Sequence, residues 1–166
     1  FPACYQDEFP TGYLIRLSDI NEYSSFGWLI YSDELSRKPQ TPASQFRLLR
    51  QFEWTGYTNR HEYYIFSKLQ PRYFIGRSLR FCPICFKGNA YYKNYWQLKV
   101  STVCLDHNVW LHDCCSKCGL GIDFSKSKIY ICQCGELYKD SEISCVSEEI
   151  LSLQKFIDSV GMVRES

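Results

Sequence analysis

Apolar residues recur at helical spacing near the start of the chain. The set, spaced three and four positions apart, comprises Tyr13, Leu14, Leu17 and Ile20. We expect Asp7 to cap this helix and Glu8 to lie in its first turn, where the helix dipole favours negative charge. Asn21 lies near its expected end. The chain therefore opens with a short loop followed by one amphipathic helix.

The next stretch predicts further helices. A second short helix begins at Ser24 or Ser25 and carries Phe26, Trp28, Leu29 and Ile30. Residues 36–44 contain two prolines and no periodicity, which indicates a loop. Residues 45–70 have helical spacing again, interrupted by a turn at residues 55–59. Helices joined by short turns fit a DNA-reading helix-turn-helix, and they equally fit any small helical bundle.

The pattern changes between Tyr73 and Glu136, where the elements become short. Strand-forming residues alternate there with cysteine-containing turns, and they include Val100, Val103, Tyr130 and Ile131. A final helix is predicted over residues 148–158, with apolar positions at Ile150, Leu151, Leu153, Phe156 and Ile157. The pattern as a whole predicts a small α+β protein.

Composition adds limits to this picture. Hydrophobic residues make up 45% of the chain and charged residues 22%, so the chain should fold. Aromatic residues reach 17%, which fits either a small core or a binding surface. No apolar run approaches the roughly 20 residues that cross a bilayer, and the first residues lack the pattern of a signal peptide.

The formal charge of +1 does not predict strong non-specific binding to DNA. A local basic stretch could still contact phosphate or a protein partner, although such a stretch is commonly a solvated face. Its members are Arg72, Arg77, Arg80, Lys87 and Lys93.

Ten cysteines could form disulfides or bind metal, and their spacing favours metal. Nine of them lie between Cys82 and Cys145, mostly in tight pairs beside proline or glycine, whereas a secreted disulfide framework would scatter them. We therefore expect zinc in a reducing cytoplasm. Two turn-borne pairs, Cys82-Pro-Ile-Cys85 and Cys104-Leu-Asp-His107, are separated by 18 residues and predict a tetrahedral structural site.

A second predicted site follows at once. Its pairs are Cys115-Ser-Lys-Cys118 and Cys132-Gln-Cys134, each followed by a glycine that can take a positive φ. Cys114 competes with Cys115 for the metal, but the C-x-x-C spacing to Cys118 favours Cys115. The eight predicted ligands of two structural Zn²⁺ ions are Cys82, Cys85, Cys104, His107, Cys115, Cys118, Cys132 and Cys134.

These ligand sets favour a non-catalytic protein. A catalytic zinc keeps an open position for water, whereas both sites here have four Cys or His ligands. The signatures of zinc deaminases, zinc proteases and P-loop nucleotide-binding proteins do not occur. Cys4 and Cys145 are interpreted as buried apolar residues rather than ligands, and His61 and His112 as surface or packing residues. The aromatic cluster at Tyr91, Tyr92, Tyr95 and Trp96 is interpreted as core, with a base-stacking platform as the alternative.

The ordered motifs resemble the TniQ family. They run from Arg80-Phe-Cys82-Pro-x-Cys85 through Tyr91, Tyr92 and Trp96 to Val103-Cys104-x-x-His107 with Leu111, and then to the two pairs of the second site. Asp7-Glu8, Tyr13-Leu14-x-Arg16-Leu17 and Asn21 resemble the opening of that family. This sequence departs from the family at Cys104-Leu105 and Cys115-Ser116, where Cys-Pro is frequent, and at Asn108, where Gly is usual. We expect these changes to affect turn stiffness rather than ligation.

The resemblance implies three parts: a helix-turn-helix-like part at 1–72, tandem zinc ribbons at 73–145 and a C-terminal helix at 146–166, which either ends the chain or leads to a second domain. It implies a bacterial, cytoplasmic, nucleoid-associated adaptor that links a CRISPR effector complex or target DNA to the AAA+ ATPase TnsC, which recruits the transposase. The alternative is a sequence-specific DNA-binding protein, either a TnsD-like target-site binder or a regulator. Homodimerisation stays open.

Overall fold

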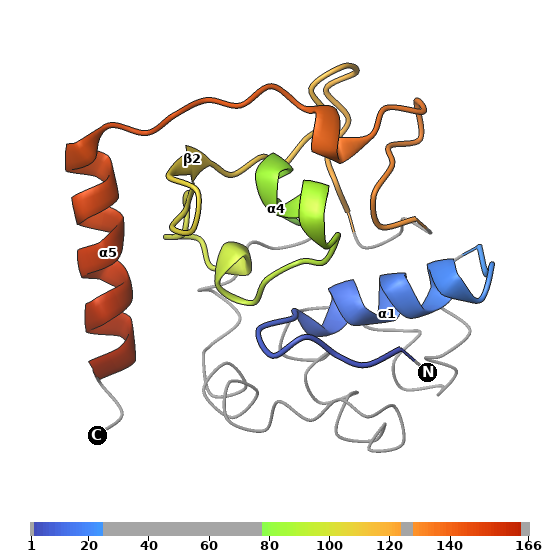
Figure 1. Ribbon diagram of the computed structural model, residues 1–166, viewed down its shortest axis with the longest axis horizontal. Helices are drawn as coiled ribbons and strands as arrows, with labels where there is room; N and C mark the ends of the chain where they lie inside the picture. The colour runs from blue at the N-terminus through green and yellow to red at the C-terminus, as the bar shows by residue number, and fades with distance from the viewer. Residues whose placement is uncertain (1, 25–77, 124–127, 164–166) are drawn as a thin grey trace.

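The computed structural model describes residues 2–24, 78–123 and 128–163. These residues form a small α+β structure with two α-helices longer than ten residues, α1 and α5, and one short two-stranded sheet. In Figure 1, α1 lies below the short elements of the middle region, and α5 stands at one edge beside β2. The predicted class is therefore confirmed for the described residues.

Helix α1 spans Pro10–Ile20, and its apolar side is fully buried as the sequence predicted for Tyr13, Leu14 and Leu17. Ile20, assigned to the same side, is instead 59% exposed. Asn21 is the C-cap of the helix, and its side-chain amide donates to the carbonyl of Leu17 at 2.7 Å. The helix end is therefore where the sequence places it.

The predicted start of α1 is wrong. Phe9 is the N-cap, no side chain caps the helix, and proline occupies the first turn. Proline suits this position because its φ is already helical and its missing N–H would have no helical partner. Asp7 and Glu8 lie before the helix, where the Glu8 N–H closes a turn onto the Tyr5 carbonyl, and each forms an ion pair there instead. The pattern of capping residues alone could not reveal these partners, Arg16 for Glu8 and Lys93 for Asp7.

The middle region is assembled from short elements, as predicted. In chain order they are α4 (Pro83–Gly88), the 3₁₀ turn η4 (Tyr95–Gln97), β1 (Val103–Cys104), β2 (Val109–Trp110) and the 3₁₀ turn η5 (Tyr138–Asp140). Strands β1 and β2 are antiparallel, with Val103 opposite Trp110 and Cys104 opposite Val109. Single bridges join further segments, including Phe81 with His112 and Ile131 with Leu137. The backbone is thus held together by many isolated pairings.

Aromatic rings fill the core between these elements. The ring of Phe81 lies 5.2 Å from that of Phe86 and 4.9 Å from that of Tyr138. Tyr92 and Trp96 are fully buried, and both rings contact Phe86. These two members of the aromatic cluster are therefore core residues, as interpreted, because no face is left for a base to stack on.

Helix α5 spans Glu148–Val163, five residues longer than predicted at its end. Glu148 and Glu149 lie in its first turn, which the helix dipole favours. One side meets the middle region, where Gln154 accepts a hydrogen bond from the Thr102 backbone N–H at 3.0 Å. Leu153 and Phe156 are exposed on the helix. Among the described residues, every helix is too short or too polar to cross a membrane.

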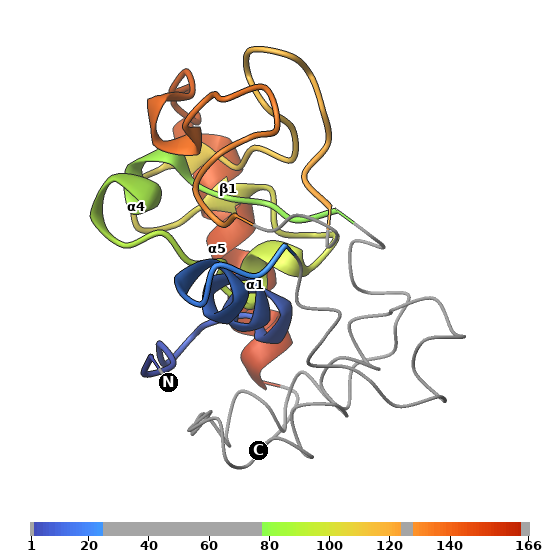
Figure 2. The ribbon, with the colours of Figure 1, turned by 90° about the vertical axis from the view of Figure 1, so that its right-hand side faces the viewer.

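The predicted helix from Ser24 or Ser25, the loop at 36–44 and the helices at 45–70 lie outside the described residues. The helix-turn-helix therefore stays a prediction. Figure 2, turned by a quarter, shows α1 and α4 on the same side of the molecule, with α5 behind them. The described N-terminal segment is thus placed against the region that carries the cysteines.

Candidate metal centres

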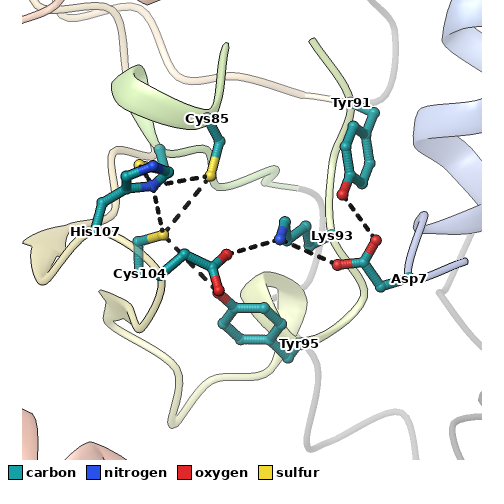
Figure 3. Close-up of polar contacts among 9 residues, drawn as sticks. Asp7, Cys85, Tyr91, Lys93, Tyr95, Cys104 and His107 are labelled. Carbon is teal, nitrogen blue, oxygen red and sulfur yellow. Dashed lines mark hydrogen bonds and ion pairs between the residues drawn. The ribbon is translucent and has the colours of Figure 1, made fainter. Parts of the chain in front are cut away.

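The first predicted ligand set comes together in space. Cys82 is the N-cap of α4 and Cys85 lies within that helix, while Cys104 ends β1 and His107 lies in the turn before β2. The ligand atoms of all four residues lie within 4.8 Å of one another. His107 presents Nδ1, which is 3.3 Å from Cys85 Sγ, 3.6 Å from Cys104 Sγ and 3.7 Å from Cys82 Sγ. Figure 3 shows this convergence.

These distances fit a tetrahedral zinc ion. Zn–S bonds of about 2.3 Å at tetrahedral angles place two sulfurs about 3.8 Å apart, and a Zn–N bond of about 2.0 Å places nitrogen about 3.5 Å from each sulfur. The Sγ atoms of Cys85 and Cys104 are 3.8 Å apart, and the three S–N distances bracket the expected value. The distance between the two sulfurs is far longer than a disulfide bond of about 2.05 Å. We call this set the first metal centre.

The second predicted ligand set also converges, and we call it the second metal centre. Its residues are Cys115, Cys118, Cys132 and Cys134. The Sγ atoms of Cys115 and Cys134 are 3.7 Å apart, as are those of Cys118 and Cys132, again the spacing of a zinc tetrahedron. Both groups could therefore hold a metal ion, and their donors suit Zn²⁺.

Glycines shape the turns of the second metal centre as predicted. Gly119 has φ of 69° and Gly135 has φ of 88°, a region that other residues rarely adopt. The Gly119 N–H donates to the carbonyl of Cys115, and the Gly135 N–H donates to that of Cys132. Each turn thereby directs its cysteine pair toward one point. Cys114 is not part of the set, in agreement with the preference for Cys115, and its backbone pairs with Gly121.

Asn108 replaces glycine in the corresponding turn of the first metal centre. Its φ is 55°, within the left-handed region that asparagine tolerates better than most residues. The Asn108 N–H still donates to the carbonyl of Cys104 at 2.8 Å, and its carbonyl accepts from Val146. The turn therefore keeps the geometry that brings His107 to the cysteines, in agreement with the expectation that this departure spares ligation.

The sulfurs of the first metal centre influence one another strongly. Hydrogen bonding with Cys104 raises the pKa of Cys82 to about 11 and raises the pKa of Cys85 still further. Hydrogen bonds from Cys82 and Cys85 lower the pKa of Cys104 well below its usual range. The Cys104 thiolate is thus favoured by hydrogen bonds from two neighbouring thiols. A divalent cation would allow all three to ionise, because it neutralises their mutual repulsion.

A polar network surrounds the first metal centre, and sequence reasoning missed it. The Lys93 ammonium lies 2.7 Å from the carboxylate of Asp106, which is located between Cys104 and His107, and 3.2 Å from that of Asp7. Tyr91 donates its hydroxyl hydrogen to Asp7 at 2.8 Å, and Tyr95 directs its hydroxyl to Cys104 Sγ at 3.9 Å. Figure 3 shows the chain of contacts from Asp7 to the ligands.

Burial alone would lower the pKa of Lys93, but Asp106 and Asp7 outweigh it and hold that pKa above its usual value. Burial raises the pKa of Tyr95, and the neighbouring Cys104 raises it further. Lys93 is therefore charged and Tyr95 is a neutral hydroxyl donor at neutral pH. No local signal links Asp7 to a motif more than eighty residues away, which explains why the network could not be predicted.

A second buried pair holds the segment before α1. Arg16 donates from Nε to Glu8 Oε1 at 2.9 Å and from Nη2 to Glu8 Oε2 at 2.6 Å, and the Glu8 carboxylate is fully buried. Burial raises the pKa of Glu8 despite these bonds, whereas Glu8 more than offsets the effect of burial on Arg16 and raises its pKa. This geometry is bidentate, which makes the pair specific as well as charged.

The predicted partner-contact residues have different environments. Arg80 is half-buried and donates to the carbonyls of Leu98 and Ser101, while Lys93 is bound in the network above. Lys87, at the end of α4, is exposed. Arg72 and Arg77 lie outside the described residues. A role in partner contact stays a prediction for all five.

The remaining candidate residues do not join either centre. His112 packs its ring 5.5 Å from that of Phe81, and burial lowers its pKa, in keeping with a packing role. Cys4 is partly buried, and its thiol donates to the Tyr5 carbonyl. Cys145 is exposed rather than buried, which corrects the expectation for that residue. All ten cysteines are described, and none is in a disulfide.

The described residues thus define a class of protein: a small α+β chain whose middle region carries two groups of four ligands, each of which could hold a metal ion such as Zn²⁺. The family model of TniQ matches residues 1–111, two thirds of the chain, so the chain belongs to the TniQ family. That family consists of transposition-associated proteins. The match includes the first metal centre and ends before the second. A search of curated proteins found no match.

Proposed function

We propose that the protein is a non-catalytic adaptor in DNA transposition, which links a CRISPR effector complex or target DNA to the AAA+ ATPase TnsC. TnsC would then recruit the transposase. Membership of the TniQ family carries this proposal, since the match runs from α1 through the first metal centre. The proposed arrangement is a helical part at 1–72, a metal-binding part at 73–145 and a C-terminal helix at 146–166, acting in the bacterial cytoplasm at the nucleoid.

The metal centres support a scaffold rather than an enzyme. Each could supply four protein ligands to zinc, so a bound ion would have no open position for water or substrate. The elements around them are only two to six residues long, too short to be stable alone. Metal binding would supply the missing folding free energy, as it does in other small zinc modules.

The described surface favours a protein partner over a phosphate backbone. Two of the three described cations in the basic stretch, Arg80 and Lys93, already bind groups of the chain. By contrast, apolar side chains of α5 are exposed, with Leu153 at 57% and Phe156 at 63%. Exposed aromatic and aliphatic side chains are common anchors of protein interfaces, whereas phosphate binding needs free cations.

Co-sedimentation with nucleotide-bound TnsC from the same element tests the proposal. The zinc-loaded chain should pellet with nucleotide-bound TnsC, with and without DNA. The fraction of chain that pellets is compared between Phe156→Ser, which removes an exposed apolar side chain of α5, and Lys87→Gln, which removes an exposed charge. Binding that requires TnsC supports the adaptor. Failure to bind TnsC, combined with salt-dependent affinity for one DNA sequence, would contradict it and favour a sequence-specific DNA-binding protein.

A further inference from the structure

The segment between the two halves of the first metal centre touches both a metal ligand and the N-terminal segment. Residues 91–97 supply Tyr95, whose hydroxyl faces Cys104 Sγ, and Lys93, which binds Asp106 in the loop that carries Cys104 and His107. The same segment supplies Tyr91 and again Lys93 to Asp7. We call residues 91–97 the bridging segment. Figure 3 shows Lys93 of this segment between the metal ligands and Asp7.

Backbone pairing reinforces the side-chain contacts on the N-terminal side. The Phe9 N–H donates to the carbonyl of Tyr92 at 2.6 Å, and the Asn94 N–H donates to that of Asp7 at 2.8 Å. The ring of Tyr5 stacks on that of Tyr91 with centroids 4.2 Å apart. Phe9 is the N-cap of α1, so the position of α1 depends directly on that of the bridging segment.

We infer that Lys93 and Tyr95 are positioning residues of the first metal centre. Through them, metal binding at this centre is coupled to the packing of the N-terminal segment and α1 against the bridging segment. Tyr95 orients and partly neutralises a ligand thiolate. Lys93 holds the ligand loop through Asp106 and the N-terminal segment through Asp7. Outer-shell groups of this kind affect metal affinity because they fix the ligands before the metal arrives.

The coupling must act in both directions. If metal at the first centre stabilises the packed position of the N-terminal segment by some factor, then a substitution that destabilises this packing must weaken metal binding by the same factor. Asp7 is the informative residue, because its carboxylate contacts Lys93 and Tyr91 but no metal ligand. The second metal centre is the internal reference, because it lies on residues 115–134, apart from this network.

Cobalt provides the probe, because Co²⁺ bound by three thiolates and one imidazole has visible bands distinct from those of Co²⁺ bound by four thiolates. The full chain is loaded with Co²⁺ and titrated with a chelator, so that release from each centre is followed separately. We expect Lys93→Met and Tyr95→Phe to lower affinity at the first centre about 10-fold, and Asp7→Asn to lower it about 5-fold. The second centre should not change.

Lys117→Met is the matched control, because Lys117 forms an ion pair with Glu136 beside the second centre, 3.4 Å apart. It should leave the first centre unchanged, and Lys93→Arg should restore most of the loss seen with Lys93→Met. Hydrogen exchange then measures the reverse direction: amides of α1 should lose protection when the first centre releases its metal while the second stays loaded. Unchanged affinity in Asp7→Asn, or equal losses at both centres, would overturn the coupling.

Discussion

The two metal centres have similar ligand geometry but different surroundings. In the first, Cys82 and Cys104 are fully buried, and Tyr95 and Lys93 surround the ligands. In the second, Cys118 and Cys134 are exposed, and the neighbouring ion pair of Lys117 and Glu136 lies at the surface. Cys115 and Cys132 of the second centre are buried as well, so the two centres differ at their remaining ligands. Cys85 is half-buried and His107 is exposed in the first, whereas Cys118 and Cys134 are both exposed in the second.

This difference has an electrostatic side. Three thiolates exceed the two charges of Zn²⁺ by one, whereas the four of the second centre exceed them by two. Water can solvate the excess negative charge of the second centre, because two of its cysteines are exposed. The first centre, more deeply buried, relies on a hydroxyl donor and a nearby ammonium. The burial and the charged neighbours of the two centres, rather than their ligand geometry, should therefore determine how they differ in stability and metal release.

Ligand removal should have the largest effect. Metal analysis of the native chain should give two zinc ions, and Cys82→Ser or Cys118→Ser should remove one or both and unfold much of the region beyond residue 78, since structural zinc binding contributes about 10 kcal/mol or more. Thermal unfolding followed by near-ultraviolet circular dichroism measures this. Cys4→Ser is the control and should stay folded, because Cys4 belongs to neither ligand set. Retention of full stability by Cys82→Ser would refute the framework.

The buried ion pair should give the next largest effect. Arg16→Met would leave the Glu8 carboxylate buried without its cation and should cost about 3–5 kcal/mol of folding free energy. Lys117→Met breaks the surface pair of the second centre and should cost less than about 1 kcal/mol. Chemical denaturation compares the two variants. Equal losses would show that burial does not separate these pairs.

Metal release should distinguish the centres kinetically. Because Cys118 and Cys134 are exposed, a chelator should remove metal from the second centre about ten-fold faster than from the first. Affinity at both should fall as pH falls, since cysteine must lose its proton to bind metal. Stopped-flow chelation of the cobalt-loaded chain from pH 8 to pH 5 measures both trends. Faster release from the first centre would reverse the comparison.

The turns should give the smallest effects. Gly119→Ala and Gly135→Ala should each destabilise the chain by about 1–2 kcal/mol, because a left-handed φ disfavours a side chain. An added Cβ would meet no atom within 4 Å at either position, so the cost is conformational and not steric. Asn108→Ala should cost about 1 kcal/mol, and Asn108→Gly should be nearly neutral. Thermal melts of the four variants with both metals bound provide the measurement.

Local pattern was sufficient to locate the two long helices of the described residues and the groups of ligands. Helical periodicity located α1 and α5, and cysteine spacing selected Cys115 over Cys114. Pattern failed where charged residues have distant partners. Asp7 was assigned to a helix cap because aspartate commonly serves there, but in the fold it binds Tyr91 and Lys93. Lys93 was likewise assigned to a basic stretch from its sequence neighbours, because its carboxylate partners could not be seen in the local pattern.

The sequence by itself determined which residues could hold metal, because two ligands on one turn are placed together by local geometry, and it determined the short, aromatic-rich character of the middle region. Only the tertiary structure decided which charges are bound within the chain and which ligands of each centre are exposed. Those properties depend on tertiary contacts, such as that of Asp7 with Lys93, which lies far away in sequence, and on burial, which strengthens the electrostatic interaction of Glu8 with Arg16 in a way that local composition does not reveal.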